Sequence, residues 1–261
     1  MAILERNGTG GVVHLQMNAP ERLNALSDAM LAALQTTLDE IAQDGSARVV
    51  VLSGAGKAFC AGHDLREMTA ARQAEDGGAA AFKDLFDRCS GVMARIQSMP
   101  QPVIAQVHGI ATAAGCQLVA TCDMAVAADD TRFGVNGVNI GLFCSTPMVA
   151  LTRNIPRKQA FEMLTTGNFI SAARAETLGL INRAVPPETL AQETAALAAQ
   201  VAGKLGVAVK IGKRAFYDQL DLTTAAAYAH TGAVMVQNML QSDTEEGIAA
   251  FLEKRDPKWT Q

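Results

Sequence analysis

Cysteine, aromatic side chains and net charge are all scarce in this chain of 261 residues. The five cysteines are odd in number and form no C-x-x-C pair, so a disulfide framework or a zinc site is not expected, and we expect reduced, mostly buried thiols. The 5% aromatic content favours close backbone packing over an aromatic-filled core. The net charge of −4 argues against nucleic acid or an anionic membrane as the main partner.

Long apolar runs are missing too, since none reaches the roughly 20 residues that cross a bilayer. The first residues, "MAILERNGTGG", have neither the apolar region of a signal peptide nor the composition of a transit peptide, so we expect a cytoplasmic protein. What the chain does have is 49% hydrophobic and 18% charged residues. That is enough for one large α/β domain, or a domain with a helical appendage.

Strands alternate with helices along most of the chain. The runs 48–54 and 102–109 are continuously apolar, the pattern of strands buried on both faces. Ser27 is a suitable cap for an amphipathic helix that stops at Asp44. The other patterns predict strands over 11–18, 124–129 and 181–185, and helices over 82–99, 116–123, 147–153, 157–166 and 171–178.

From Glu188 onward the pattern is helical only. This change predicts an α/β core over residues 1–187 and a helical C-terminal segment over residues 188–261. In open α/β folds, ligands bind at the carboxyl ends of the strands. We therefore look for a ligand site just after the two continuously apolar strands.

Several familiar motifs fail. "GAGKAF" is not a phosphate-binding loop, because Val51 replaces the first glycine and Ala58 replaces the final Ser or Thr. "GTGG" precedes a strand instead of following one, so it is not a dinucleotide fingerprint, and no G-x-S-x-G elbow occurs. His63 and Asp64 have no second histidine at ligand spacing, so no metal is expected.

Two loops rich in small residues follow the apolar strands: "AFCAGHDL" (58–65) and "GIATAAGCQL" (109–118). Small residues let a ligand approach the backbone. A helix that begins near Gly115 offers unpaired N–H groups and a dipole that favours negative charge. Two such donors converging on one oxygen form an oxyanion hole. The spacing of these residues fits two interpretations equally well, an oxyanion hole or a pair of tight turns between strand and helix with no functional role.

These loops belong to a longer series of segments that resembles the enoyl-CoA hydratase/isomerase (crotonase) superfamily over essentially the whole chain. The segments are "ERLNAL" (21–26), "AFCAGHDL" (58–65), "IAQVHGIATAAGCQL" (104–118), "CDMAVAAD" (122–129), "FGVNGVNIGLF" (133–143), "LTTGNFISAARAETLGLINRAVP" (164–186) and "GIAAFLEKRDPKW" (247–259). Within the family, "ATAAGCQLVATCDMAVA" and "GVNIGLFCSTP" are most similar to a divergent branch.

The resemblance implies an α/β fold, a right-handed spiral of repeated β-β-α turns with a C-terminal helical trimerisation segment. It also implies a homotrimer or a dimer of trimers (a hexamer) that acts on acyl-CoA thioesters in fatty acid metabolism. Coenzyme A would be part of the substrate, with no separate cofactor. Two backbone N–H groups would stabilise a thioester enolate, and the matching motifs place them at His63 and Ala114. Thr112, Ala113 and Ala114 stand where the family is richer in glycine, so a positive φ there would cost energy.

The resemblance further implies residues that bind the coenzyme and the acyl group. For coenzyme A these are Arg22, Leu23, Ala25, Lys57, Ala61, His63, Leu65 and Gly115, with Phe251 and Lys254 closing the site from the same or a neighbouring subunit. Arg22 would lie near the phosphates; the alternative for Arg22, Lys57 and Lys254 is ordinary solvated surface charge. Asn139, Cys144 and Ser145 are candidates for the acyl pocket.

Both glutamates that family hydratases use are missing. Aligned motifs place Gln117 at the first glutamate position and Gly137 at the second, and neither residue exchanges protons at neutral pH. Each general acid–base group is typically worth about 10²–10⁴-fold in rate, so classical hydration is in doubt. Gln117 could instead hold a water or a substrate carbonyl, and Gly137 could leave room for a bulkier acyl group. Adding a glutamate at both positions is then expected to raise hydration.

Other side chains offer limited replacements. His63 has a suitable pKa range for proton transfer, with a structural role as the alternative. Cys144 has no evident base to make it a nucleophile. His108 is expected to be a hydrogen-bonded core histidine, and Asp64 and Asp123 are expected to brace the backbone.

Three hypotheses stay open from the sequence. The first is an enzyme of the hydratase/isomerase (lyase) family, either a hydratase or a catalyst of another acyl-CoA reaction such as decarboxylation or hydrolysis. The second is a non-catalytic acyl-CoA-binding or regulatory protein. The third is a structural trimer, against which the two small-residue loops argue, because a scaffold does not need them.

Overall fold

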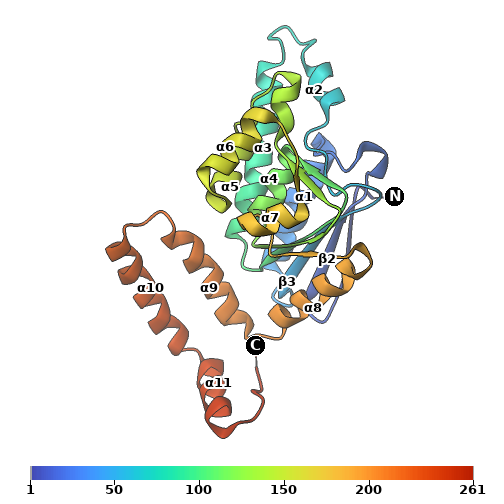
Figure 1. Cartoon of the computed structure of the whole chain (residues 1–261). Helices are drawn as coiled ribbons and strands as arrows, with labels where there is room; N and C mark the ends of the chain where they lie inside the picture. Colours follow the sequence, from blue (N-terminus) through green and yellow to red (C-terminus); the bar gives the residue numbers. More distant parts are fainter. Residues whose placement is uncertain (1, 261) are drawn as a thin grey trace.

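The apolar runs form a six-stranded sheet in the computed structural model, which describes residues 2–260 (Figure 1). The sheet order is β1-β2-β3-β4-β6-β9. The strands are β1 (Leu4–Thr9), β2 (Val12–Met17), β3 (Val49–Gly54), β4 (Val103–Val107), β6 (Met124–Ala128) and β9 (Arg183–Val185). All neighbours pair in parallel except β1 and β2. The predicted strands over 11–18, 48–54, 102–109, 124–129 and 181–185 are therefore confirmed.

Strand β1 was not predicted. Its sequence, LERNGT, is mostly polar and exposed, so it carries little strand periodicity. It forms because it folds back on β2 in an antiparallel hairpin, with Leu4 opposite Met17 and Thr9 opposite Val12. Gly10 and Gly11 make the two-residue turn with φ of 59° and 82°, which glycine adopts without strain.

A second sheet of three very short strands lies beside the first, in the order β5-β7-β8. Its strands are β5 (Ile110–Thr112), β7 (Arg132–Gly134) and β8 (Ile170–Ser171). They were not predicted, because two or three residues are too few to show a period. This sheet matters for the site, since β5 leads directly into α4 (Ala114–Thr121).

Helices cover the sheets and supply many of the core side chains. The helices of the core are α1 (Asp28–Gln43), α2 (Leu65–Ala71), α3 (Ala79–Ser98), α4 (Ala114–Thr121), α5 (Pro147–Asn154), α6 (Arg157–Thr166), α7 (Ala172–Leu178) and α8 (Leu190–Ala202), with short 3-10 turns at Pro20–Arg22, Asn136–Ile140 and Pro187–Thr189. The Ser27 hydroxyl accepts a hydrogen bond from the Met30 N–H at 3.2 Å, which confirms the predicted cap. Helix α2 was not predicted.

The last helices form an arm that projects from the core (Figure 1). Helix α8 still packs on the sheet, where Ala198 joins Val49, Val51 and Ile104 in one apolar cluster. The arm consists of α9 (Gly206–Gln219), α10 (Thr224–Met239) and α11 (Ser242–Glu253), and no residue of α10 is buried. The division of the chain at residues 187 and 188 stays a prediction, with α8 on its C-terminal side packed against the core.

A buried ion pair ties the arm to the core. The Lys213 ammonium of α9 donates to the Asp123 carboxylate at 2.7 Å and to the carbonyl oxygens of Ile96 and Gln101 at 2.7 and 2.8 Å. Asp123 also accepts from the Tyr217 hydroxyl at 2.8 Å and from the Val103 N–H at 2.6 Å. Asp123 thus braces the backbone at the start of β4, as predicted, and also anchors α9.

Among residues 2–260, no single helix has the length and apolar character needed to cross a membrane. One bent pair, Pro187–Ala202 with Gly206–Gln219, passes that test only when the two helices are taken together across a 101° bend.

Candidate functional site

The two loops predicted to form the site lie against each other and against the "ERLNAL" segment. Backbone hydrogen bonds join Leu26 N–H to Gly62 O at 2.7 Å and Thr112 N–H to Cys60 O at 3.1 Å. The approach is close enough to require glycine, because a Cβ atom on Gly115 would lie 2.2 Å from the Cys60 carbonyl oxygen. The structure therefore brings together segments that are distant in the sequence, since Leu26 and Gly62 are 36 residues apart and Cys60 and Thr112 are 52 residues apart.

Asn24 holds this arrangement and was not singled out from the sequence. It is fully buried, its Nδ2 donates to the Ala55 and Ala58 carbonyl oxygens at 2.8 Å each, and its Oδ1 accepts from the Ala19 N–H at 2.9 Å. Its φ of 52° is one that asparagine tolerates better than most residues. The asparagine inside "ERLNAL" was the available signal.

The backbone N–H groups of His63 and Ala114 lie on adjoining segments. Among the described residues, neither donates a hydrogen bond to a backbone carbonyl. A Cβ atom on Gly62 would lie 3.3 Å from the Ala114 nitrogen, which shows how closely the first loop approaches the start of α4. Ala114 is the first residue of α4, where the helix dipole favours a negatively charged ligand.

Ala113, just before α4, has a strained backbone. Its φ of 50° and ψ of −120° lie in a region that side-chain-bearing residues rarely adopt. The conformation is held by the Ala113 N–H, which donates to Gly134 O at 2.9 Å, and by its carbonyl, which accepts from Gln117 N–H at 3.0 Å. The positive φ considered for this loop is thus present, at a residue with a Cβ. Strain of this kind is common where a backbone group must point in one direction.

The His63 ring faces the protein interior. Its Nδ1 lies 3.4 Å from the Leu26 carbonyl oxygen, and the ring meets Phe86 edge-on at 5.6 Å. Burial lowers the pKa of His63, which favours the neutral ring. These contacts fit the structural role offered as the alternative to proton transfer.

Gln117 lies on α4 three residues after Ala114 and is 5% exposed. Its Oε1 is enclosed and has no hydrogen-bond partner among the described residues. An amide at this position cannot serve as a proton carrier.

Gly137 does not leave the open space suggested from the sequence. A Cβ atom there would lie 2.5 Å from the Leu142 carbonyl oxygen and 2.8 Å from the Cys144 sulfur. The loop after the 3-10 turn Asn136–Ile140 folds over this glycine, so neither a bulkier acyl group nor a glutamate side chain fits without moving the loop. The expectation that Gly137 leaves room is therefore corrected, whereas the effect of a glutamate here on hydration stays a prediction.

The three residues predicted for the acyl pocket have different surroundings. Cys144 is buried, and burial raises the pKa of its thiol, which disfavours the nucleophilic thiolate. Ser145 is exposed, and its hydroxyl makes a long 3.4 Å contact to Phe143 O. Asn139 turns toward the end of α6, with its Nδ2 3.4 Å from Gly167 O. Among the described residues, no hydrogen bond joins these three side chains to one another, and their role in an acyl pocket stays a prediction.

The predicted coenzyme residues divide into two groups. Those of the first two segments come together, since the Ala61 N–H donates to Leu23 O at 3.0 Å. Phe251 and Lys254 lie on the arm, away from these loops in the same chain (Figure 1). A contribution from them would need a neighbouring subunit, as the prediction allowed.

Arg22 is held by acidic side chains. Its guanidinium donates to Asp64 at 2.9 Å and lies 3.8 Å from Glu67, while Asp64 accepts from the Arg66 and Glu67 N–H groups at the start of α2. These hydrogen bonds and Arg22 lower the pKa of Asp64 despite its burial. Asp64 therefore braces the backbone, as predicted, and Arg22 steadies the residue that follows His63.

Lys57 and Leu65 are exposed at the ends of the first loop, and Leu65 is 51% exposed. His108 is hydrogen-bonded, as predicted, with its Nε2 2.8 Å from Gly56 O, but it is only half-buried, so its predicted place in the core is wrong. All five cysteines are buried and unpaired, which agrees with the expected thiols.

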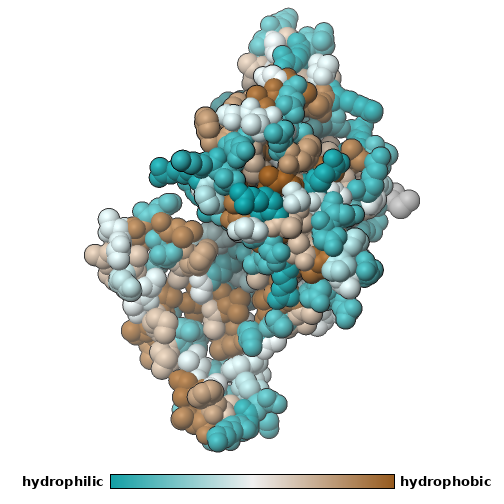
Figure 2. All heavy atoms as spheres, in the orientation of Figure 1, coloured by the Kyte–Doolittle hydropathy of each residue, from teal (hydrophilic) through white to brown (hydrophobic). Residues whose placement is uncertain are grey.

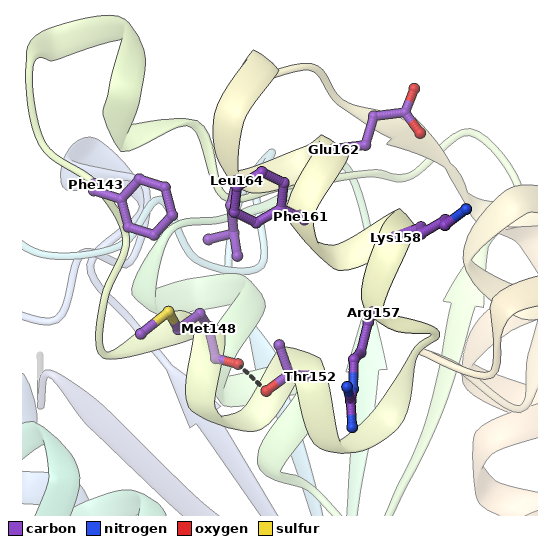
Figure 3. Close-up of a pocket in the computed structure, with 8 residues that line it drawn as sticks. All are labelled: Phe143, Met148, Thr152, Arg157, Lys158, Phe161, Glu162 and Leu164. Atoms are coloured by element: carbon purple, nitrogen blue, oxygen red, sulfur yellow. Dashed lines mark hydrogen bonds between the residues drawn. The ribbon is translucent and has the colours of Figure 1, made fainter.

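A cavity of about 660 Å³ opens between α5 and α6 (Figure 3). Phe143, Met148, Phe161 and Leu164 gather around it, while Lys158 and Glu162 point away from it. None of its lining residues comes from the loops 58–65 or 109–118, which carry the two N–H donors. The sequence had not indicated it.

With this site described, comparison with known proteins defines its class. The enoyl-CoA hydratase/isomerase family model matches residues 7–261, so the chain belongs to that family. The predicted family and fold class are both confirmed.

Particular relatives support the divergent branch that the sequence indicated. The chain is similar to enoyl-CoA hydratase domain-containing protein 3, mitochondrial, from Homo sapiens (45% identity, covering 96% of this chain and 81% of the relative) and from Xenopus laevis (44%, 96% and 83%). The crystal structure of the human protein superposes with a TM-score of 0.94 at 43% identity, covering 98% of this chain and 100% of that one. An enoyl-CoA hydratase structure from Mycobacterium smegmatis superposes with a TM-score of 0.95 at 52% identity, covering 99% of both chains.

These relatives contradict the predicted cytoplasmic location. The vertebrate proteins all carry the word mitochondrial in their names, which contradicts an assignment to the cytoplasm by resemblance. The composition of the first residues was a poor guide to the compartment.

Proposed function

We propose that this chain binds acyl-CoA thioesters and stabilises a thioester enolate between the N–H groups of His63 and Ala114. The observation that carries the proposal is the pair of unused N–H donors on closely packed loops, with the second donor held by the strained Ala113. Such fixed donors act strongly on developing negative charge, because they need no reorganisation during the reaction. The names of the relatives, enoyl-CoA hydratase and proteins with that domain, support a coenzyme A thioester as the ligand.

Classical hydration is not the reaction that this site favours. The amide of Gln117 exchanges no proton, and Gly137 is covered by Leu142 and Cys144. Without two carboxylates, addition of water to an enoyl thioester loses up to about 10²–10⁴-fold for each missing group. We expect hydration to be slow or absent, which keeps a non-catalytic acyl-CoA-binding role as the alternative.

Decarboxylation is a second candidate, favoured by the absence of a carboxylate side chain at both Gln117 and Gly137. When the bond between C2 and a carboxylate breaks, CO₂ leaves and its electron pair stays on the thioester as an enolate. No side chain has to remove a proton, and the enolate later takes one from water. Two N–H donors are then sufficient to stabilise the intermediate.

Self-association belongs to the same proposal. Large apolar side chains of the arm are exposed, among them Tyr228 at 77%, Leu240 at 80%, Phe251 at 81% and Leu252 at 74%. Apolar surface gathers over the arm in Figure 2. Because exposed apolar patches of this kind usually mark an interface, we propose that the arm joins copies of the chain into a homotrimer or a dimer of trimers.

The test removes one N–H donor. Ala114→Pro deletes the donor at the first position of a helix, where proline is tolerated. We expect calorimetry to show butyryl-CoA binding to the native protein and binding at least about tenfold weaker in the variant, the worth of a strong hydrogen bond. Loss of crotonyl-CoA absorbance measures hydration in the same samples.

The matched control is Ala172→Pro, which makes the same change at the first position of α7, outside the loops of the site. It should bind as the native protein does. If the native protein binds no thioester, or if both proline variants bind equally well, the proposed role of Ala114 is wrong.

A further inference from the structure

The side-chain amide of Gln117 is buried and forms no hydrogen bond that stabilises the fold of the described residues. Its Oε1 is enclosed and unpartnered, and its side chain makes no hydrogen bond among the described residues. Asn24, the nearby buried amide, differs because both of its ends are hydrogen-bonded to backbone. The Nε2 end of Gln117 likewise has no hydrogen-bond partner among the described residues, and a largely buried donor without a partner costs stability, so an acceptor from outside the chain is expected at that end.

Helix geometry sets where that partner lies. Gln117 follows Ala114 by three residues on α4, so the two are neighbours on one face of the helix. Side chains on a helix lean toward its N-terminus, which brings the Gln117 amide toward the Ala114 N–H. With the thioester oxygen on that N–H, the amide lies beside the first carbons of the acyl chain.

The surroundings decide which end of the amide meets the ligand. Oε1 has no accessible surface, so the NH₂ end is the one available as a donor. On the side of Gly137, the neighbours are the Leu142 carbonyl oxygen and the Cys144 sulfur, and burial raises the thiol pKa so that Cys144 stays neutral. No carboxylate stands at either glutamate position to repel an oxygen that carries negative charge.

We infer that Gln117 selects acyl thioesters that carry an acceptor oxygen on C3, as 3-oxoacyl and malonyl-type thioesters do. The inference rests on the proposed function, because it takes the thioester oxygen to lie between His63 and Ala114. Saturated and enoyl chains offer the amide nothing to bind. A ketone or carboxylate oxygen on C3 accepts the NH₂ donor that the fold leaves unused.

The same substrates suit a site without glutamates. In a 3-oxoacyl thioester, the negative charge on C2 is shared with both carbonyls, so the C2 proton passes to solvent hydroxide and no strong base on the protein is needed. In a malonyl-type thioester, loss of CO₂ forms the enolate directly. The two substrate types share one recognition chemistry, an acceptor oxygen on C3, and differ in the reaction that follows.

Calorimetry with three thioesters tests the inference on the native protein. Acetoacetyl-CoA carries a C3 ketone, malonyl-CoA carries a C3 carboxylate, and butyryl-CoA carries no C3 oxygen. We expect at least one oxygenated thioester to bind about tenfold more tightly than butyryl-CoA, the worth of one hydrogen bond. Whichever of acetoacetyl-CoA and malonyl-CoA binds more tightly identifies the preferred oxygen as that of a ketone or of a carboxylate.

Variants then assign the preference to Gln117. Gln117→Met keeps the length of the side chain without its donor, and the affinity ratio should fall to about one. Gln101→Met removes another buried glutamine, whose Nε2 bonds to Ile41 O at 2.8 Å outside the site, and should keep the native ratio. Circular dichroism confirms that both variants are folded.

Two results would overturn the inference. Equal affinity of the native protein for all three thioesters would mean that the Gln117 amide hydrogen-bonds to water and not to the ligand. A preference that persists in Gln117→Met would mean that another group binds the C3 oxygen. Failure to bind any thioester is a different result, since it removes the proposed function itself.

Discussion

The backbone of Ala113 stores strain that a single substitution should release. With φ of 50° and ψ of −120°, an alanine there costs about 1–3 kcal/mol relative to a relaxed residue. Glycine adopts this conformation without the penalty but loses about 0.4–1 kcal/mol through its more flexible unfolded chain. Ala113→Gly should therefore raise the free energy of unfolding by about 1 kcal/mol.

A Cβ atom placed on Gly62 would lie 3.0 Å from the Ala113 Cβ, so the absence of a side chain on Gly62 leaves room for the Ala113 methyl group. The strain at Ala113 therefore lies in its backbone dihedral angles. Urea unfolding followed by circular dichroism measures the change, and the thermal midpoint should rise by about 2–4 °C for a chain of this size.

The neighbouring residue supplies the control. Ala114 lies in the helix and is buried, so Ala114→Gly should lower the free energy of unfolding by about 1 kcal/mol. Opposite signs for two adjacent Ala→Gly changes would establish the strain. If Ala113→Gly destabilises the protein as much as Ala114→Gly, the reasoning is refuted.

Three more predictions come from buried groups. Lys213→Met leaves the Asp123 carboxylate without its cation, so urea unfolding should show that the free energy of unfolding falls by about 3–5 kcal/mol. An unchanged free energy of unfolding would mean that the ion pair is dispensable. Gln117→Glu alone should raise the rate of crotonyl-CoA hydration by up to about 10²-fold. Adding Gly137→Glu should abolish this gain, because the new side chain collides with the loop at Leu142 and Cys144. A further gain in the double variant would contradict the crowding around Gly137. Burial raises the pKa of the Cys60 thiol from 9.0 to about 12, so between these pH values the thiol ionises in the unfolded chain but not in the folded one. The free energy of unfolding should therefore be unaffected by this thiol below pH 9 and should fall by about 1.4 kcal/mol per pH unit as the pH rises toward 12. An unchanged slope in a Cys60→Ala variant would refute this.

Much of the core was predictable because its signals are local. Continuous apolar runs marked β3 and β4, and the Ser27 cap marked the start of α1. Strand β1 and the small sheet escaped prediction, since β1 is polar and the strands of the small sheet have only two or three residues. Their formation depends on a partner strand that a local pattern does not contain.

The candidate site shows the same limit. Small residues in the two loops indicated a close approach of backbones, and the structure places those loops side by side. The sequence left Arg22 as a phosphate ligand or a free surface charge, whereas the structure pairs it with Asp64, 42 residues away. A partner at that separation cannot be read from charge pattern alone.

The main alternation of strands and helices, the family, and the presence of Gln117 and Gly137 in the two motifs were determined by the sequence alone, because each depends on residue types in linear order. Tertiary structure decided the rest: the strain at Ala113, the cover over Gly137, the unused amide of Gln117 and the anchor of the arm at Lys213. Each of these depends on contacts between segments distant in the chain. Their energies are set by distance, burial and available partners, which exist only once the chain has folded.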